Sequence, residues 1–262
     1  MKALFVAWQE PNTRRWVPVG RLTYGDGTYK FVYTRGAKES KDFTPFGRMV
    51  ELDAAYVSDV LFPLFANRLL PKSRPEYADY LRWLGLSEQE HNELEVLARS
   101  GGSRATDTLE MFPCPEPTAD KHYEAYFFSH GLRHLIPQNQ ARVSELQAGE
   151  RLFLMRDLQN EHDTMALLLR TNDPISIVGY CPRYYSGEFS RLLESVAQDQ
   201  VRVSVEQVNP DAPMQLRLLC KLSAPWPANF TACSMDKFQP LATEGDDQSR
   251  KFRHTAGSLP DP

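Results

Sequence analysis

The sequence of 262 residues has few cysteines, no long apolar run and no excess of basic residues. Its four cysteines stand far apart and form no Cys-x-x-Cys pair, which argues against a zinc knuckle and against a disulfide framework. No apolar stretch approaches the ~20 residues that span a bilayer, and the apolar start of the chain is too short for a signal peptide. We therefore expect a cytoplasmic protein with reduced thiols.

The charge balance argues against one kind of nucleic-acid binding. The formal net charge is -4, and residues 125–227 contain 10 Lys+Arg against 11 Asp+Glu. Tight nonspecific binding of a duplex relies on many phosphate contacts, which this balance does not favour. It is compatible with a small pocket that recognises the end of a strand.

The usual catalytic motifs are missing from the sequence. It has no phosphate-binding Gly-x-x-x-x-Gly-Lys-Ser/Thr loop, no Gly-x-Gly-x-x-Gly, no Gly-x-Ser-x-Gly elbow and no His-Glu-x-x-His helix. The pair His162-Asp163 has no candidate nucleophile beside it. We expect a protein that is not an enzyme and needs no metal or cofactor. An unrecognised hydrolase is a third hypothesis for which no residues stand out.

The first part of the chain alternates strand and helix patterns. Residues 4–8, 16–23 and 28–34 alternate apolar and polar positions, as strands do, and Gly25-Asp26-Gly27 predicts a tight hairpin between the last two. Ser73-Arg74-Pro75-Glu76 predicts a capping box that opens a helix ending at Gly85. Ser87-Glu88-Gln89-Glu90 predicts a second cap, for a helix ending at Gly101-Gly102.

A boundary is expected at residues 111–121, where Pro113, Pro115 and Pro117 predict a stiff linker. Beyond it the period of two returns, and one helix at about 182–197 interrupts the strands. The expected strands are 151–156, 165–170, 176–180, 201–208 and 215–222. The residues after 227 are expected to form a polar, largely disordered tail.

Four motifs in the second half occur in a characteristic order. They are Gly131-Leu132-Arg133-His134, the Gly149-led strand 149–154, Asn160-Glu161-His162-Asp163 with Ala166-Leu167, and Val178-Gly179-Tyr180 before the helix. Together they resemble the HIRAN domain over about residues 125–225. This resemblance implies an OB-like barrel that binds single-stranded DNA at its 3′ end, and DNA-repair helicases, nucleases and bacterial proteins carry such domains.

The resemblance also implies roles for individual residues. Arg133 and Arg183 would meet phosphates, and His134 would line the base pocket. His162 and Asp163 would read the strand end, beside Asn160 and Tyr184. His134 and His162 stand where tyrosine is common in the family, so affinity is expected to be weaker or pH-dependent.

Each of these residues also has a simpler interpretation. After Asn160, Asp163 is equally consistent with a turn held by side-chain to backbone hydrogen bonds. Arg133 could be a surface strand residue, and Tyr184 a helix-packing residue. Tyr180 and Phe153 are expected in the core.

The first half resembles the N-terminal region of HipA-type proteins. Val19-Gly20-Arg21-Leu22 with Tyr29–Tyr33 is similar to their opening β-region, and residues 61–71 are similar to their Phe-x-Asn-Leu-Leu-Pro-Glu-Gly stretch. Pro71-Lys72-Ser73 departs from Pro-Glu-Gly, and the kinase core is missing. A lone copy is similar to the inhibitory partners of split HipA-like toxins. This implies a partner-binding surface, for which the candidates are Phe65, Asn67, Arg68 and Lys72, although the apolar residues here equally fit a core.

We thus expect an α+β protein with a HipA-N-like β/α interaction domain at 1–110, a linker at 111–121, an OB-like HIRAN barrel with one inserted helix at 122–227 and a tail at 228–262. The leading hypothesis is a non-enzymatic bacterial accessory or regulatory protein that binds single-stranded DNA at a 3′ end, with its first domain on a protein partner. The alternative is an antitoxin-like inhibitor or regulator of a HipA-family kinase.

Overall fold

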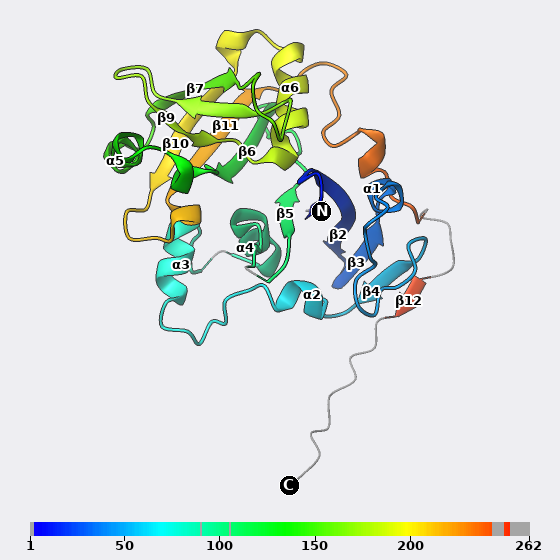
Figure 1. Cartoon of the computed structure of the whole chain (residues 1–262). Helices are drawn as coiled ribbons and strands as arrows, with labels where there is room; N and C mark the ends of the chain where they lie inside the picture. The colour runs from blue at the N-terminus through cyan, green and yellow to red at the C-terminus, as the bar shows by residue number, and fades with distance from the viewer. Residues whose placement is uncertain (1–2, 90, 105, 243–248, 252–262) are drawn as a thin grey trace.

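The computed structural model describes residues 3–89, 91–104, 106–242 and 249–251. It contains two six-stranded sheets, one built mainly from the first 113 residues and one from the second half (Figure 1). None of the helices described is both long and apolar enough to cross a membrane.

The first sheet is antiparallel except at one edge. Its strand order is β12-β4-β3-β2-β1-β5, and β12 alone pairs in parallel, with β4. The expected hairpin is confirmed, since Asp26 and Gly27 adopt positive φ angles of 51° and 76° between two paired strands. The strands are β1 (Ala3–Gln9), β2 (Trp16–Gly25), β3 (Thr28–Tyr33), β4 (Ala55–Ser58), β5 (Leu109–Pro113) and β12 (Ser249–Lys251).

The helices of the first half are short, and both predicted caps are wrong in detail. The four are α1 (Arg35–Glu39), α2 (Pro63–Ala66), α3 (Tyr77–Trp83) and α4 (Glu93–Ser100). Helix α3 begins after Glu76 without a side-chain cap, whereas α4 has a capping box formed by Asn92 and Glu95. Asn92, five residues after the predicted Ser87, accepts a hydrogen bond from the backbone N–H of Glu95, so the helix is shorter than expected.

The second sheet curls until its edges meet. Its order is β6-β11-β10-β7-β8-β9, all antiparallel, and a bridge between His130 and Tyr180 joins the end of β6 to β9. The strands are β6 (His122–Phe128), β7 (Arg151–Arg156), β8 (Leu167–Arg170), β9 (Ile177–Tyr180), β10 (Arg202–Val208) and β11 (Leu218–Pro225). Two α-helices accompany this sheet rather than one, α5 (Pro137–Glu145) and α6 (Arg183–Ser195).

Strands β1 and β5 divide their side chains between two cores. Leu109 and Met111 of β5 pack into the core of the first half, under α2 and α4. Phe112 faces the other way and joins the core of the second half, together with Phe5 and Ala7 of β1. Because side chains alternate along a strand, one sheet thereby forms the floor of both cores.

Polar contacts also fasten the two halves to each other. Two side-chain amides, at and just after the end of β10, donate hydrogen bonds to the last turn of α3. Gln207 Nε2 donates to the Arg82 carbonyl, and Asn209 Nδ2 donates to the Trp83 carbonyl, each at 2.9 Å. The guanidinium of Arg99 lies 4.0 Å from the ring centroid of Tyr126, a cation–π contact. The halves therefore form one continuous body.

The expected linker and tail differ from the structure. Residues 109–113 form β5, which pairs with β1, so the proline-rich stretch begins as a sheet strand. Within 228–242, expected as tail, Phe230, Cys233 and Phe238 are buried in the second core. These apolar side chains are too sparse to give a periodic pattern. Phe238 packs against Phe5 and Phe112 of the first half, whereas Phe230 packs against Tyr123 and Trp226 of the second. The rest of the expected tail lies outside the described residues, apart from β12.

Candidate nucleic-acid interface

The loop between β7 and β8 is shaped by two polar side chains. Asn160 Oδ1 accepts hydrogen bonds from the backbone N–H of His162 and Asp163, at 3.1 and 3.0 Å. Asp163 Oδ1 accepts from the N–H of Met165 at 2.9 Å. These are the turn contacts that such residues make with their own backbone, and they leave the His162 side chain exposed.

Asp163 also ties this loop to helix α6. Its second oxygen, Oδ2, accepts a hydrogen bond from the Ser186 hydroxyl at 2.8 Å. Arg183 lies one turn earlier on the same helix and donates from Nη1 to the Arg14 carbonyl in the first half, at 2.8 Å. Both carboxylate oxygens of Asp163 are thus engaged within the protein, so its position is fixed from two sides.

Tyr184 packs between the two halves rather than lining an open pocket. Its ring stacks on Phe112, with centroids 4.6 Å apart and planes at 12°, and meets Trp16 edge to face at 6.3 Å. The His130 ring lies 6.3 Å away, also edge to face. The helix-packing interpretation of Tyr184 agrees with this geometry.

A polar chain links the loop to the strand that carries the last motif. The Tyr180 hydroxyl donates to Asp157 Oδ2 at 2.9 Å, and Asn160 Nδ2 donates to the same oxygen at 3.1 Å. Tyr180 is only half-buried, and so is Phe153, which lies 4.9 Å from the guanidinium groups of both Arg151 and Arg170. The prediction that Tyr180 and Phe153 are core residues was therefore wrong.

Arg133 and His134 stand on a single 3₁₀ turn, η1 (Leu132–His134), which follows the His130–Tyr180 bridge. Gly131 enters this turn with a φ of 77°, which glycine adopts without strain. Both side chains are exposed, and Arg133 Nε donates to His134 Nε2 at 3.0 Å. Both side chains are therefore accessible to a ligand.

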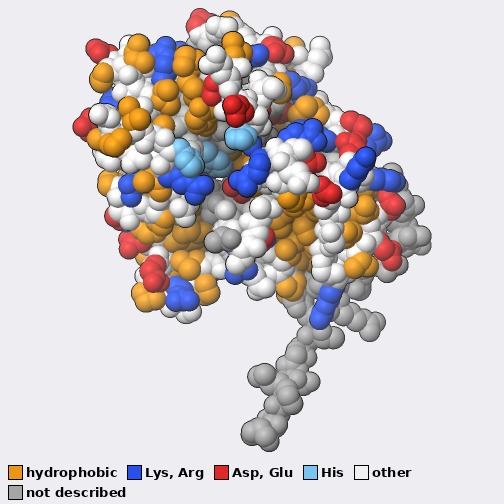
Figure 2. All heavy atoms as spheres, viewed as in Figure 1, with side chains coloured by type: hydrophobic (Ala, Val, Ile, Leu, Met, Phe, Trp, Pro, Cys, Tyr) orange, Lys and Arg blue, Asp and Glu red, His pale blue; other side chains and the backbone are white. Residues whose placement is uncertain are grey.

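A cavity of about 580 Å³ opens beside this turn. Figure 2 shows a hollow between the upper and lower parts of the molecule where histidine and basic side chains gather. One wall comes from 129–134 and 214–216, and the other from the first half. The lining residues of the first half include Tyr80, Ser100, Ser103, Arg104 and Glu110.

Two titratable residues at this cavity were missed by sequence reasoning. Although Glu110 and His130 keep some surface at the cavity, the surrounding protein holds them away from bulk water. Burial raises the pKa of Glu110 to about 7 and lowers the pKa of His130 to about 4. The available signal was the alternation along residues 109–112, which places Glu110 on the same strand face as Phe112.

The predicted DNA-binding residues thus form two groups. Arg133 and His134 line the cavity, whereas the loop 160–163 and the start of α6 lie around the Asp163–Ser186 contact. His130 lies between the two groups: it lines the cavity, its backbone pairs with Tyr180, and its ring contacts Tyr184.

The expected partner-binding residues are divided between interior and surface. Phe65 is 1% exposed and lies in the first core. The guanidinium of Arg68 pairs with Asp107 and donates to the Gly102 carbonyl at 2.8 Å, with its side chain 2% exposed. These two side chains cannot reach a partner. Asn67 and Lys72 are exposed.

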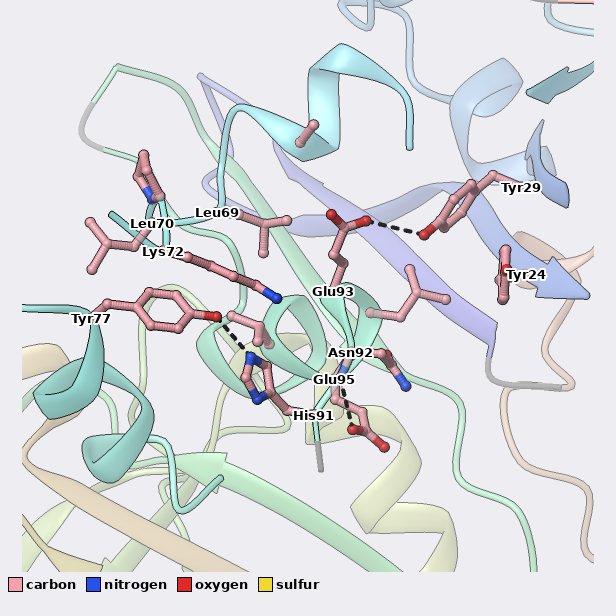
Figure 3. A pocket seen from close by; sticks show the side chains of 14 residues that line it. Tyr24, Tyr29, Leu69, Leu70, Lys72, Tyr77, His91, Asn92, Glu93 and Glu95 are labelled. Carbon is pink, nitrogen blue, oxygen red and sulfur yellow. Dashed lines mark hydrogen bonds between the residues drawn. The ribbon is translucent and has the colours of Figure 1, made fainter. Parts of the chain in front are cut away.

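Lys72 belongs to a second cavity, of about 790 Å³, in the first half. It extends toward Glu93 between Tyr77 and Leu69 (Figure 3). Tyr29 donates to Glu93 at 3.1 Å on the far side, and the Tyr77 hydroxyl lies 2.7 Å from His91 Nε2. In the part of the chain that the structure describes, no group of three or more His, Cys, Asp or Glu is arranged to hold a metal.

Comparison with known proteins identifies the second half. Residues 122–226 match the family model of the HIRAN domain, so the chain contains a HIRAN domain. No curated protein sequence matches the chain. The family match does not reach the first half, and nothing found supports its resemblance to HipA-type proteins.

Two solved structures are similar to part of the chain. A protein from Lactobacillus plantarum is 20% identical, with a TM-score of 0.31, and the match covers 38% of this chain and 96% of that one. The HIRAN domain of human HLTF is 16% identical, with a TM-score of 0.30 over 38% of this chain and 74% of that one.

Proposed function

We propose that the HIRAN domain of this protein binds single-stranded DNA at a 3′ end. The observation that carries the proposal is that Arg133 and His134, exposed on one turn of a HIRAN domain, face a cavity of about 580 Å³. A cavity of this size can take a terminal nucleotide, since small-molecule sites typically measure about 300–1,000 Å³.

The residues at the cavity supply two kinds of contact. In this proposal the Arg133 guanidinium binds a backbone phosphate, a charge-assisted contact that carries no base information. The exposed imidazole of His134 stacks on an unpaired base. The hydrogen bond from Arg133 Nε to His134 keeps the two side chains together, so phosphate and base would be held at a fixed spacing.

The second group lies beside the path of the strand. Arg183 uses Nη1 on the Arg14 carbonyl, and its remaining donors are proposed to meet a second phosphate. His162 offers an exposed ring at the tip of the loop. Asn160 and Asp163 are proposed to position that loop, because their side chains bind its backbone and helix α6.

The role of the first half stays a prediction. We propose a non-enzymatic bacterial accessory protein whose first half contacts a protein partner through Asn67 and Lys72, the exposed members of the expected surface. An antitoxin-like inhibitor or regulator of a HipA-family kinase remains the alternative function. A stable complex with such a kinase, measured with purified proteins, would favour that alternative.

Fluorescence anisotropy with short oligonucleotides tests the proposed function. We expect preference for a single strand ending in a 3′ hydroxyl over the same strand ending in a 3′ phosphate and over a blunt duplex. Arg133→Ala should weaken binding to every sequence and reduce the salt slope by about 0.7, the value for one phosphate contact on a single strand.

Arg74→Ala is the matched control, because Arg74 is exposed and does not line the cavity. Absence of binding to any of the oligonucleotides would overturn the proposed function. Equal losses in the two variants would remove Arg133 from the site.

A further inference from the structure

The cavity beside Arg133 has walls from both halves of the protein. Ser129 to His134 form one wall, and α3, the loop 100–104 and β5 of the first half form the other. The HIRAN match begins only at residue 122, so nearly half of the residues that line this pocket lie outside the HIRAN domain.

Strand β5 places a carboxyl in that outside wall. Glu110 follows the alternation that sends Phe112 toward the second half, so both side chains point away from the core that holds Leu109 and Met111. Among the described residues, none donates a hydrogen bond to the Glu110 carboxyl. Asp163, by contrast, has both oxygens engaged with Met165 and Ser186. Asp163 also does not line the cavity, and Glu110 is the one carboxyl among the described residues that do.

The same outside wall supplies a second cation. Arg104 is exposed at the cavity, and no carboxylate of the described residues pairs with it. The other arginine of this wall, Arg68, is neutralised by Asp107. A strand end in the cavity would thus lie between Arg104 on one wall and Arg133 on the other.

The two walls are held in fixed positions. Phe112, the second neighbour of Glu110 along β5, stacks on Tyr184 of α6, and Arg82 at the end of α3 forms an ion pair with Asp211 at 2.6 Å. Apolar residues of α3 and α4, such as Leu81 and Val96, share a core cluster with Leu219 of β11. The pocket is therefore preformed, which reduces the entropy cost of binding.

We propose that the first half completes the end-binding pocket, with Glu110 accepting a hydrogen bond from the terminal 3′ hydroxyl and Arg104 binding the adjacent phosphate. This inference rests on the proposed function and adds a residue that selects between ends. An ionised carboxylate attracts a hydroxyl donor and repels a terminal phosphate, so Glu110 would give the preference for the free hydroxyl.

Several titratable or charged groups line the cavity with Glu110, but burial is what raises the pKa of its carboxyl. Tyr184 of α6 is close, His130, Arg133 and His134 stand on the opposite wall, and Arg104 shares its own wall. Burial brings the pKa of Glu110 to about 7, so the carboxyl ionises between about pH 6 and 8. The preference for a hydroxyl end should increase over this interval.

The test uses the full chain, the two oligonucleotides with 3′ hydroxyl and 3′ phosphate ends, and anisotropy at pH 6 and pH 8. Glu110→Gln keeps the size of the side chain but cannot ionise. We expect Glu110→Gln to lower the ratio of affinities for the hydroxyl and phosphate ends at pH 8 about tenfold, equal to about 1.4 kcal/mol. The rise of this ratio from pH 6 to pH 8 should also disappear. Titration of the phosphate itself contributes equally in both proteins.

Arg104→Ala is expected to lower the affinity for both oligonucleotides about three- to tenfold and to reduce the slope of log affinity against log salt concentration by about 0.7. Arg104→Lys should restore most of the affinity, whereas Arg74→Ala should change nothing. If Arg133→Ala weakens binding but Arg104→Ala and Glu110→Gln leave affinity and end preference unchanged, the first half is not part of the pocket and the proposed function stands. If the parent protein binds neither strand, both proposals fail.

Discussion

Gly179 and His130 are pressed together backbone to backbone. The N–H and carbonyl groups of His130 pair with those of Tyr180, the residue after Gly179, at 2.9 Å each. A β-carbon on Gly179 would stand 2.7 Å from the His130 carbonyl oxygen. It would overlap even more closely with the Ser129 hydroxyl, which donates to the Val178 carbonyl at 2.8 Å. This contact sets the position of the turn that carries Arg133.

Gly179→Ala is expected to destabilise the fold strongly. The residue has a φ of 114°, which alanine rarely adopts, and the added methyl group has no space. We expect a loss of about 3 kcal/mol in the free energy of unfolding, from backbone strain and overlap together. Chemical denaturation measures this loss. Gly149→Ala is the control, because Gly149 also has a positive φ (83°) but a β-carbon added there would meet nothing within 4 Å. Equal losses of stability in the two variants would show that backbone strain alone matters.

Arg68 and Lys72 should behave oppositely on substitution. Arg68→Ala removes a buried guanidinium that binds the Gly102 carbonyl and Asp107, whose side chain is 32% exposed, so we expect a loss of about 1–3 kcal/mol in stability. Lys72→Ala, at an exposed position, should stay within about 0.5 kcal/mol. Thermal unfolding of both variants compares them. If the Arg68→Ala protein is as stable as the parent, the structural role of Arg68 is refuted and a role in partner binding is open again.

The stability of the protein should depend on pH through two opposed groups. The folded pKa of His130, about 4, is below its usual 6.5, so the folded state binds fewer protons and stability falls as the pH drops from 6.5 to 4. The folded pKa of Glu110, about 7, is above its usual 4.5, so stability from this group is present below pH 4.5 and is lost as the pH rises to 7.

Single variants separate these effects. Relative to the parent, His130→Asn should be more stable at pH 4.5 than at pH 7, and Glu110→Gln more stable at pH 7.5 than at pH 4.5, each by about 1–3 kcal/mol. Denaturant unfolding at the two pH values gives both differences. Parallel pH profiles in all three proteins would mean that neither group is desolvated.

Asp163 and Ser186 test whether the loop is positioned or contacts DNA. Asp163→Ala should lower stability by about 1–2 kcal/mol and Ser186→Ala by about 1 kcal/mol, because both break the same 2.8 Å hydrogen bond. Both should weaken DNA binding modestly and leave the preference for a hydroxyl end unchanged. Loss of that preference in Asp163→Ala alone would assign the end contact to Asp163 instead of Glu110.

The sequence predicted what depends on local pattern. The turn at Gly25–Gly27, five of the six strands of the second sheet and the HIRAN motifs are each encoded within short stretches, and the structure has them. The sixth strand, β6, was not predicted. Asn160 is an example within the site, since its turn contacts involve only residues two and three positions away.

What depends on distant packing was not predictable. Phe112 precedes a proline-rich stretch, and its contacts with Phe5, Tyr184 and Phe238, all far from it along the chain, make it part of a core. Helix α5 has a single buried residue, Val143, so its sequence lacks the apolar stripe that announces a helix. Glu110 gained its raised pKa only from the cavity that both halves enclose.

The two-faced strand β5 limits what can be learned from pieces of this protein. A fragment of residues 122–226 alone would match the family model, yet it would lack Phe5, Phe112 and Phe238, which cover Tyr184 and its neighbours. It would expose aromatic surface in water and be prone to aggregation. Experiments on isolated HIRAN fragments should therefore keep β1, β5 and residues 228–242. Chimaeras that contain this domain must likewise include the strands β1 and β5 that cover its core.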